Sequence, residues 1–336
     1  AFGVTMPIWA HSRELADQRC VVVPHVIKVR APLSGAGFAR RGIVTMSANS
    51  HQSTRSEILS HIDPDDFSWA VPIMRTGYAG RGLVYLVVAG LSLWSVLSGG
   101  QAEGTKSTLQ SLDGATGFAV IFAIATGMFA YAIWRAVDSF WDLEAYGSGA
   151  KGIVARIGML VTGIIHGAIG ALAVTVLGVS SSGSSSKELL NQFLQTPAGV
   201  WVVGGIGLVT MGTGFYYFYK AATQSYREHL EANHFTMHWN PALRIGVAAQ
   251  GVVVLIIGGL IVYAATSANA SDTGGIDAAF EWLHQQAYGR ILVGLLCAGL
   301  LMFSLFCFVN AVCRIVPKAA DPSVQSVARK IKSMAQ

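Results

Sequence analysis

The chain has 336 residues, of which 52% are hydrophobic and only 12% are charged, and its formal net charge is +5. This charged share is about half of the share that is usual for soluble proteins. The composition therefore excludes disorder for most of the chain, as well as a coiled coil and a disulfide-rich scaffold, and it points to a protein embedded in a lipid bilayer.

The N-terminal region, residues 1–74, precedes the first long apolar segment and predicts a cytoplasmic tail. Its first part, residues 1–45, carries six basic residues against two acidic ones and has no apolar run. Met46 is followed by a sequence typical of a translation start. We therefore expect residues 1–45 to be either disordered or absent from the native protein.

Six stretches without Asp, Glu, Lys or Arg follow, each at least 21 residues long. About 20 apolar residues in a helix cross a hydrocarbon core of about 30 Å. The stretches lack the alternation of polar and apolar residues that membrane β-barrel strands show. They predict an all-α integral membrane protein with transmembrane helices at 78–98, 116–138, 157–178, 199–220, 245–266 and 289–313.

The distribution of basic residues predicts the orientation of these helices. Three Lys or Arg residues lie in the connections on one side, Lys106, Lys187 and Arg290, whereas thirteen flank the other side. We expect the richer side, with both termini, to face the cytoplasm of a bacterial inner membrane. The basic tail 316–336 suits anionic lipid headgroups rather than nucleic acid.

A repeat of about 80 residues runs through the helical region. The motif Arg-x-Gly opens each odd-numbered helix, at Arg75, Arg156 and Arg244. A glycine begins each even-numbered helix, at Gly117, Gly199 and Gly289. The repeats span 75–142, 143–228 and 229–315, and since each contains two spans, all three share one orientation. We predict a pseudo-threefold bundle of six helices.

Short segments with spaced apolar residues precede the even helices, and we expect them to form interfacial helices on the outer side. Their apolar residues are Leu109 and Leu112; Leu189, Leu190 and Phe193; and Ile276, Phe280 and Leu283.

The sequence Arg75-Thr-Gly-Tyr-Ala-Gly-Arg-Gly-Leu-Val-Tyr-Leu86, the three glycine helix starts and Lys151-Gly152 resemble the bacterial membrane family called domain of unknown function 1206. The resemblance covers roughly residues 70–315 and is best in the first repeat. It implies a six-span bacterial membrane protein, and it implies no activity.

Polar residues inside the spans are the most informative positions, because ionisable groups there are costly and are often functional. On the odd helices, such residues stand six and ten positions after the repeat arginines. These two positions share one face of a helix, so the polar residues form a stripe. The stripe consists of Arg81, Tyr85, Thr162, His166 and Gln250. We expect it to face the bundle interior, where His166 would lie near the midplane. That histidine would either relay protons or bond a neighbouring hydroxyl or carbonyl as structural glue.

The even helices carry Asp138, Lys220 and Asn310 at one equivalent position near the cytoplasmic end, close to Arg75, Arg156 and Arg244. We expect Asp138 to pair with Arg156 or Arg75 and with Lys220. A structural latch is the preferred interpretation, and a selectivity ring at a pore mouth is the alternative.

His229, His234 and His238 lie in the second cytoplasmic connection, and two of them have a spacing that can bind zinc. No cysteine accompanies them, so they are weak metal candidates. We expect no cofactor.

These features favour a non-enzymatic structural, assembly or accessory protein of the membrane that docks to other membrane proteins. The alternative is a small channel or transporter with a polar path along the pseudo-threefold axis. A stripe bonded internally would favour the first hypothesis, and a water-filled path past His166 would favour the second.

Overall fold

The architecture comes from a computed structural model, which describes residues 64–112, 114–178, 194–267 and 275–319 together with residues 326, 327 and 331. All of them belong to one unit of the chain, Ile58–Gln336. The predicted tail segment 1–45 and the predicted interfacial residues Leu189, Leu190 and Phe193 lie outside the described residues.

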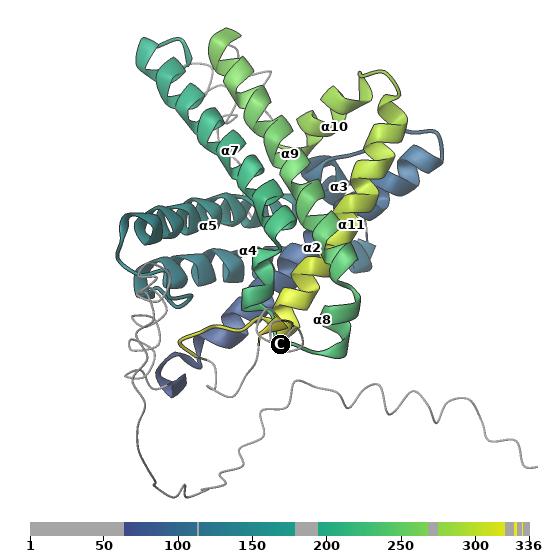
Figure 1. Ribbon diagram of the computed structural model, residues 1–336. Coiled ribbons are helices and arrows are strands. Elements are labelled where there is room, and N and C mark those ends of the chain that lie inside the picture. Colours follow the sequence, from purple (N-terminus) through teal and green to yellow (C-terminus); the bar gives the residue numbers. More distant parts are fainter. Residues whose placement is uncertain are drawn as a thin grey trace, which may run out of the picture. The chain divides into compact units, whose positions relative to one another are not determined.

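Six long helices dominate this part of the chain (Figure 1). They are α2 (Ala70–Leu97), α4 (Gly114–Trp141), α5 (Ala150–Val176), α7 (Pro197–Thr223), α9 (Asn240–Ser267) and α11 (Gly289–Cys313). All six are long and apolar enough to cross a membrane, and no strand occurs among the described residues. The predicted all-α fold with six spans is confirmed.

The helix bounds differ from the predicted ones mainly at the starts of the odd helices. α11 has the predicted bounds, whereas α2 begins at Ala70 and α5 at Ala150, well before the apolar runs. The backbone hydrogen bonds of a helix continue through Arg75 and Arg156 because charged side chains are tolerated at the polar edge of a bilayer. Runs without charges therefore underestimate the length of a spanning helix.

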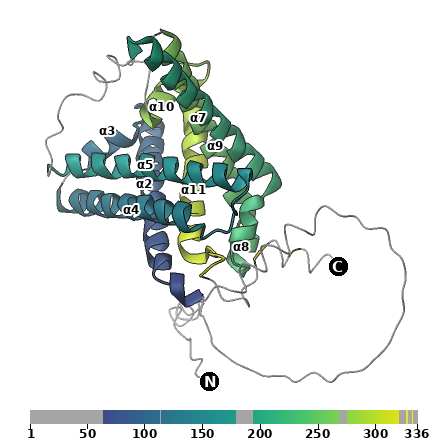
Figure 2. The ribbon, with the colours of Figure 1, turned by 90° about the vertical axis from the view of Figure 1, so that its left-hand side faces the viewer.

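The helices pack as three pairs that join neighbouring repeats. α4 packs on α5 and α7 on α9, and α11 returns to pack on α2. The pairs are then connected by α2 with α4 and by α9 with α11 (Figures 1 and 2). These contacts between helices follow the predicted threefold repeat, with one exception. α5 and α7, the two helices of the second repeat, make almost no contact over their described residues.

Two glycines permit a close approach between α2 and α4. A Cβ atom on Gly80 of α2 would lie 2.4 Å from the Cα atom of Gly127 in α4. Any side chain at either position would therefore push the two backbones apart. Away from this crossing, α4 and α5 extend away from α2 (Figure 1).

Short helices lie at the two ends of the spans. Two of the predicted interfacial helices are present, as α3 (Thr105–Gln110) and α10 (Ile276–His284). They contact each other through Ser107, whose hydroxyl donates a hydrogen bond to Asp277 at 3.1 Å. At the opposite ends of the spans lie η2 (Pro64–Phe67), η3 (Ser225–His229) and α8 (His234–His238).

Candidate functional site

Arg81 is the centre of a buried polar cluster. Arg81 lies on α2 and is only 5% exposed. Its guanidinium donates hydrogen bonds to the hydroxyls of Tyr131 at 3.0 Å and Tyr217 at 3.2 Å. The rings of Tyr85, Tyr131 and Phe303 surround it, with centroids 5.8, 5.3 and 5.0 Å from its central carbon. Arg81 is thus held by phenol oxygens and aromatic faces, which attract a desolvated cation.

Tyr131 links Arg81 to a second arginine. Its hydroxyl also accepts a hydrogen bond from Nε of Arg135 at 3.0 Å. Arg135 further donates to Tyr78 at 3.0 Å and forms ion pairs with Asp138 at 3.3 Å and Glu144 at 3.7 Å. The network therefore runs from the middle of α2 to the segment that follows α4.

Glu144, in the connection from α4 to α5, pairs with arginines of the first and third repeats. It is buried, and its carboxylate accepts hydrogen bonds from Arg314, directly after α11. Burial favours the neutral acid, but the guanidinium groups of Arg314 and Arg135 outweigh burial and hold the pKa of Glu144 well below its usual range. Arg314 also donates to Asn310 at 2.7 Å, four residues earlier in the sequence, and this bond holds its guanidinium at the end of α11.

The cluster contains more cations than anions. Its basic members are Arg81, Arg135, Lys220 and Arg314, and its acidic members are Asp138 and Glu144. Both carboxylates are engaged by Arg135 or Arg314. Within the described residues Arg81 and Lys220 form no ion pair, and the buried Nε of Arg81 has no hydrogen-bond partner. Two basic side chains, Arg81 and Lys220, thus have no acidic partner among the described side chains.

The predicted polar stripe is only partly brought together. Arg81 and Tyr85 are in contact, and His166 reaches them through Tyr131, with 4.6 Å between the centroids of the Tyr131 and His166 rings. Nδ1 of His166 lies 2.7 Å from the carbonyl oxygen of Thr162. The hydroxyl of Thr162 donates instead to Gly158, one turn earlier in α5. Gln250 is buried on α9, and its side-chain oxygen has no hydrogen-bond partner among the described residues.

The repeat arginines cap the preceding even helices. Arg156 donates to the carbonyl oxygens of Ser139 and Phe140 at the end of α4, and Arg244 donates to that of Ala221 near the end of α7. Cations are favourable there because the last carbonyl groups of a helix lack intrahelical partners. Arg75 is exposed and makes no such bond within the described residues.

The predicted partners of Asp138 are therefore wrong. Asp138 pairs with Arg135, one turn earlier on its own helix, and accepts a hydrogen bond from the backbone N–H of Glu144 at 3.1 Å. Arg156 is occupied by backbone carbonyls instead, because the end of α4 offers it acceptors at shorter reach. Lys220 forms no ion pair with Asp138.

The three histidines of the second cytoplasmic connection do not converge. His234 and His238 stack with centroids 6.0 Å apart, whereas His229 packs on Tyr146 at 6.4 Å. The part of the chain that the structure describes contains no group of three or more His, Cys, Asp or Glu side chains that is arranged to hold a metal ion.

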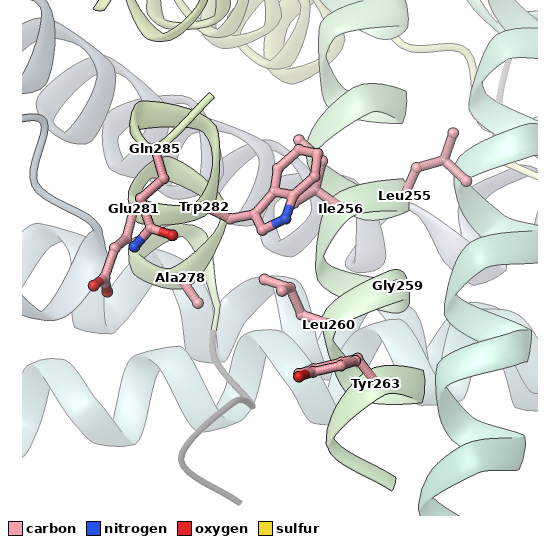
Figure 3. A pocket seen from close by; sticks show the side chains of 9 residues that line it. All are labelled: Leu255, Ile256, Gly259, Leu260, Tyr263, Ala278, Glu281, Trp282 and Gln285. Atoms are coloured by element: carbon pink, nitrogen blue, oxygen red, sulfur yellow. The ribbon is translucent and has the colours of Figure 1, made fainter. Parts of the chain in front are cut away.

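A groove of about 790 Å³ lies apart from the polar cluster, between α9 and α10 (Figure 3). Leu260 and Tyr263 of α9 and Trp282 of α10 form much of its wall, and Glu281 is its one carboxylate. A single carboxylate without a neighbouring base does not make an acid–base pair. The groove is an apolar surface next to an interfacial helix.

The sequence analysis missed the partners that organise the cluster. Tyr131, Tyr217, Arg135, Glu144 and Arg314 were not selected as site residues. Arg135 and Arg314 contribute to the prediction only as two of the thirteen basic residues that indicate the orientation. One signal was available, since Arg135 and Asp138 are three apart on a helix and so share a face.

Six apolar helices in three two-helix repeats, with ionisable groups buried between them, define a multi-pass membrane protein. The model of the family described as Domain of Unknown Function (DUF1206) matches residues 76–142, 157–224 and 245–314, and the chain belongs to this family. It is also 23% identical over 266 residues to the uncharacterized protein YxxB of Bacillus subtilis (strain 168), covering 77% of this chain and 97% of that protein. No solved structure matches the chain significantly.

Proposed function

We propose that the protein is a non-enzymatic structural or accessory component of the bacterial inner membrane. The observation that carries this proposal is the internal bonding of the intramembrane polar groups. Arg81 and Arg135 both donate to Tyr131, and His166 contacts the backbone of its own helix. Polar side chains that bond one another between spanning helices fix the helix arrangement.

The orientation forms part of the proposal. Lys and Arg are concentrated at the end of the spans where α2 begins and α11 ends, which supports cytoplasmic positions for both termini. The basic tail after α11 would then lie against anionic headgroups of the inner leaflet.

The second repeat offers the surface for other membrane proteins. In the other two repeats the odd helix packs on the even helix, whereas α5 and α7 lack this contact. Large apolar side chains are exposed on both, including Ile164 of α5 and Val209 of α7. A transmembrane helix of a partner would fill the position that the missing contact leaves.

The test is purification of the tagged full-length protein in a gentle detergent, followed by identification of stoichiometric co-purifying membrane proteins. Val209→Trp would block the proposed surface and should reduce recovery of the partner. Leu295→Trp, at a similarly exposed position of α11, is the matched control. A protein that purifies alone and supports liposome flux would contradict the accessory role.

A channel or transporter for anions is the second candidate. It is favoured by one observation, which is that Arg81 and Lys220 have no carboxylate partner in the described residues. Under this function, His166→Ala would change flux through liposomes without unfolding the protein. If the variant only lowers the thermal stability, the transport role fails.

A further inference from the structure

Lys220, one of the two basic residues without a carboxylate partner in the described part of the chain, lies at a depth that a lipid headgroup can reach. Lys220 stands three residues before the end of α7 at Thr223, so its backbone lies about 5 Å from the helix end. Arg81 lies deeper in α2, but helical side chains point towards the N-terminus, which brings its guanidinium towards the same end of the spans. Lys220 therefore lies near the level of headgroup phosphates, and Arg81 lies deeper in the span.

Lys220 is open to this environment on one side. It is half-buried, and neither a hydrogen bond nor an ion pair holds it within the described residues. Its neighbours Phe215, Tyr216 and Tyr219 on α7 are 60%, 53% and 62% exposed. On its other side, Lys220 is within electrostatic range of Arg81, Arg135 and Arg314 as well as Glu144. An ammonium group thus stands between a cationic interior and an exposed aromatic surface.

We propose that the phosphate group of an anionic phospholipid binds at Lys220, with Arg81 as the second uncompensated cation behind it. A monoanionic phosphate diester would supply the counter-charge that the described side chains lack, and Lys220 is a strong phosphate donor because its three N–H groups rotate freely. The exposed aromatic side chains around Lys220 favour a lipid over free phosphate because they would contact its acyl chains. Basic positions between spanning helices on the cytoplasmic side are suited to such headgroups.

This site is independent of the proposed function, since a scaffold and a transporter would both retain it. Full-length protein in detergent would be titrated with phosphatidylglycerol, or with phosphatidylcholine carrying the same acyl chains, and bound lipid counted by native mass spectrometry. We expect one phosphatidylglycerol to be retained preferentially. Lys220→Gln should weaken its binding about fivefold, as expected for one cation near an anionic headgroup. Lys220→Arg should restore it, and Arg75→Gln, which removes an exposed cation at the same end of α2, should leave it unchanged.

Three results would overturn the proposal. One is equal binding of the two lipids to the unmodified protein, a comparison that requires no variant and so remains decisive if Lys220→Gln does not fold. Another is a Lys220→Gln protein that binds as well as Arg75→Gln. The last is displacement of phosphatidylglycerol by sodium phosphate at equimolar concentration, which would assign the site to a free anion instead.

Discussion

The hydroxyl of Tyr131 accepts a hydrogen bond from Arg81 at 3.0 Å, and this contact joins α2 to α4 across 50 residues of sequence. The same hydroxyl accepts a second bond from Arg135. One phenol oxygen thus accepts hydrogen bonds from two guanidinium groups, and it connects Arg81, in the middle of α2, to the ion pairs of Arg135 with Asp138 and Glu144.

Tyr131→Phe should therefore destabilise the protein by more than the loss of one hydroxyl suggests. Both arginines lose an acceptor in a buried environment, and each unsatisfied charged donor costs about 1–3 kcal/mol. Thermal unfolding in detergent should show the change. Tyr219→Phe, at an exposed position of α7, should leave the unfolding temperature nearly unaltered. Equal effects of the two variants would mean that Tyr131 contributes only its ring.

Gly80→Ala tests the crossing of α2 and α4. The added Cβ would lie 2.4 Å from the Cα of Gly127, so the helices must separate, at a cost of about 1–3 kcal/mol. Gly90→Ala is the matched control because it lies on the same helix with no atom within 4 Å of the added carbon. It should be neutral or slightly stabilising, since alanine has the higher helix propensity. Similar unfolding temperatures for both variants would show that the crossing does not require glycine.

Glu144→Gln should lower stability at neutral pH by about 3 kcal/mol, because it leaves Arg135 and Arg314 without their shared carboxylate. The pKa of Glu144 is held below its unfolded value, so its ionised form stabilises the fold. This stabilisation is complete above the unfolded pKa of about 4.3 and is lost progressively as the pH falls below it.

The corresponding measurement is the unfolding temperature between pH 7 and pH 3. The native protein should lose stability over the acidic part of this range, and the difference from Glu144→Gln should shrink as the pH falls. Glu281→Gln, at an exposed position of α10, should follow the native curve throughout. Parallel curves for the native protein and Glu144→Gln would refute the role assigned to this carboxylate.

Arg156→Gln should destabilise the junction between α4 and α5 by about 1 kcal/mol, since the terminal carbonyls of α4 lose a cationic donor. Arg156→Lys should retain part of the effect because its charge remains while its planar donor pair is lost. Arg75→Gln serves as the reference, since Arg75 makes no such bond in the described residues. An Arg156→Gln protein as stable as Arg75→Gln would contradict the capping role.

The long helices and their repeats could be predicted because they depend on local properties. An uninterrupted apolar run is a direct consequence of the bilayer, and the spacing from Arg75 to Arg156 and Arg244 is visible in one dimension. The burial of Arg81 followed from the same logic, since an arginine within a span must face protein rather than lipid.

The partners of these residues could not be predicted because they depend on how the helices are arranged. Tyr217 reaches Arg81 from 136 residues away, and Arg314 reaches Glu144 from 170 residues away. Asp138 was assigned to an arginine on another helix, whereas Arg135 is nearer along its own. The predicted pseudo-threefold bundle also treats the three repeats alike, whereas α5 and α7 lack the contact that the two helices of each other repeat make.

The pairing of α11 with α2 has a consequence for biogenesis. α4 with α5 and α7 with α9 are neighbours in sequence, so each hairpin can close soon after it leaves the ribosome. Of the six described spanning helices, α11 is the main partner of α2 and comes last in the sequence. The face of α2 that contacts α11 therefore lacks this partner until α11 is synthesised, although Arg81 can already bond Tyr131 of α4 and Tyr217 of α7. A nascent chain arrested before α11 would expose that face of α2 to membrane quality-control proteases.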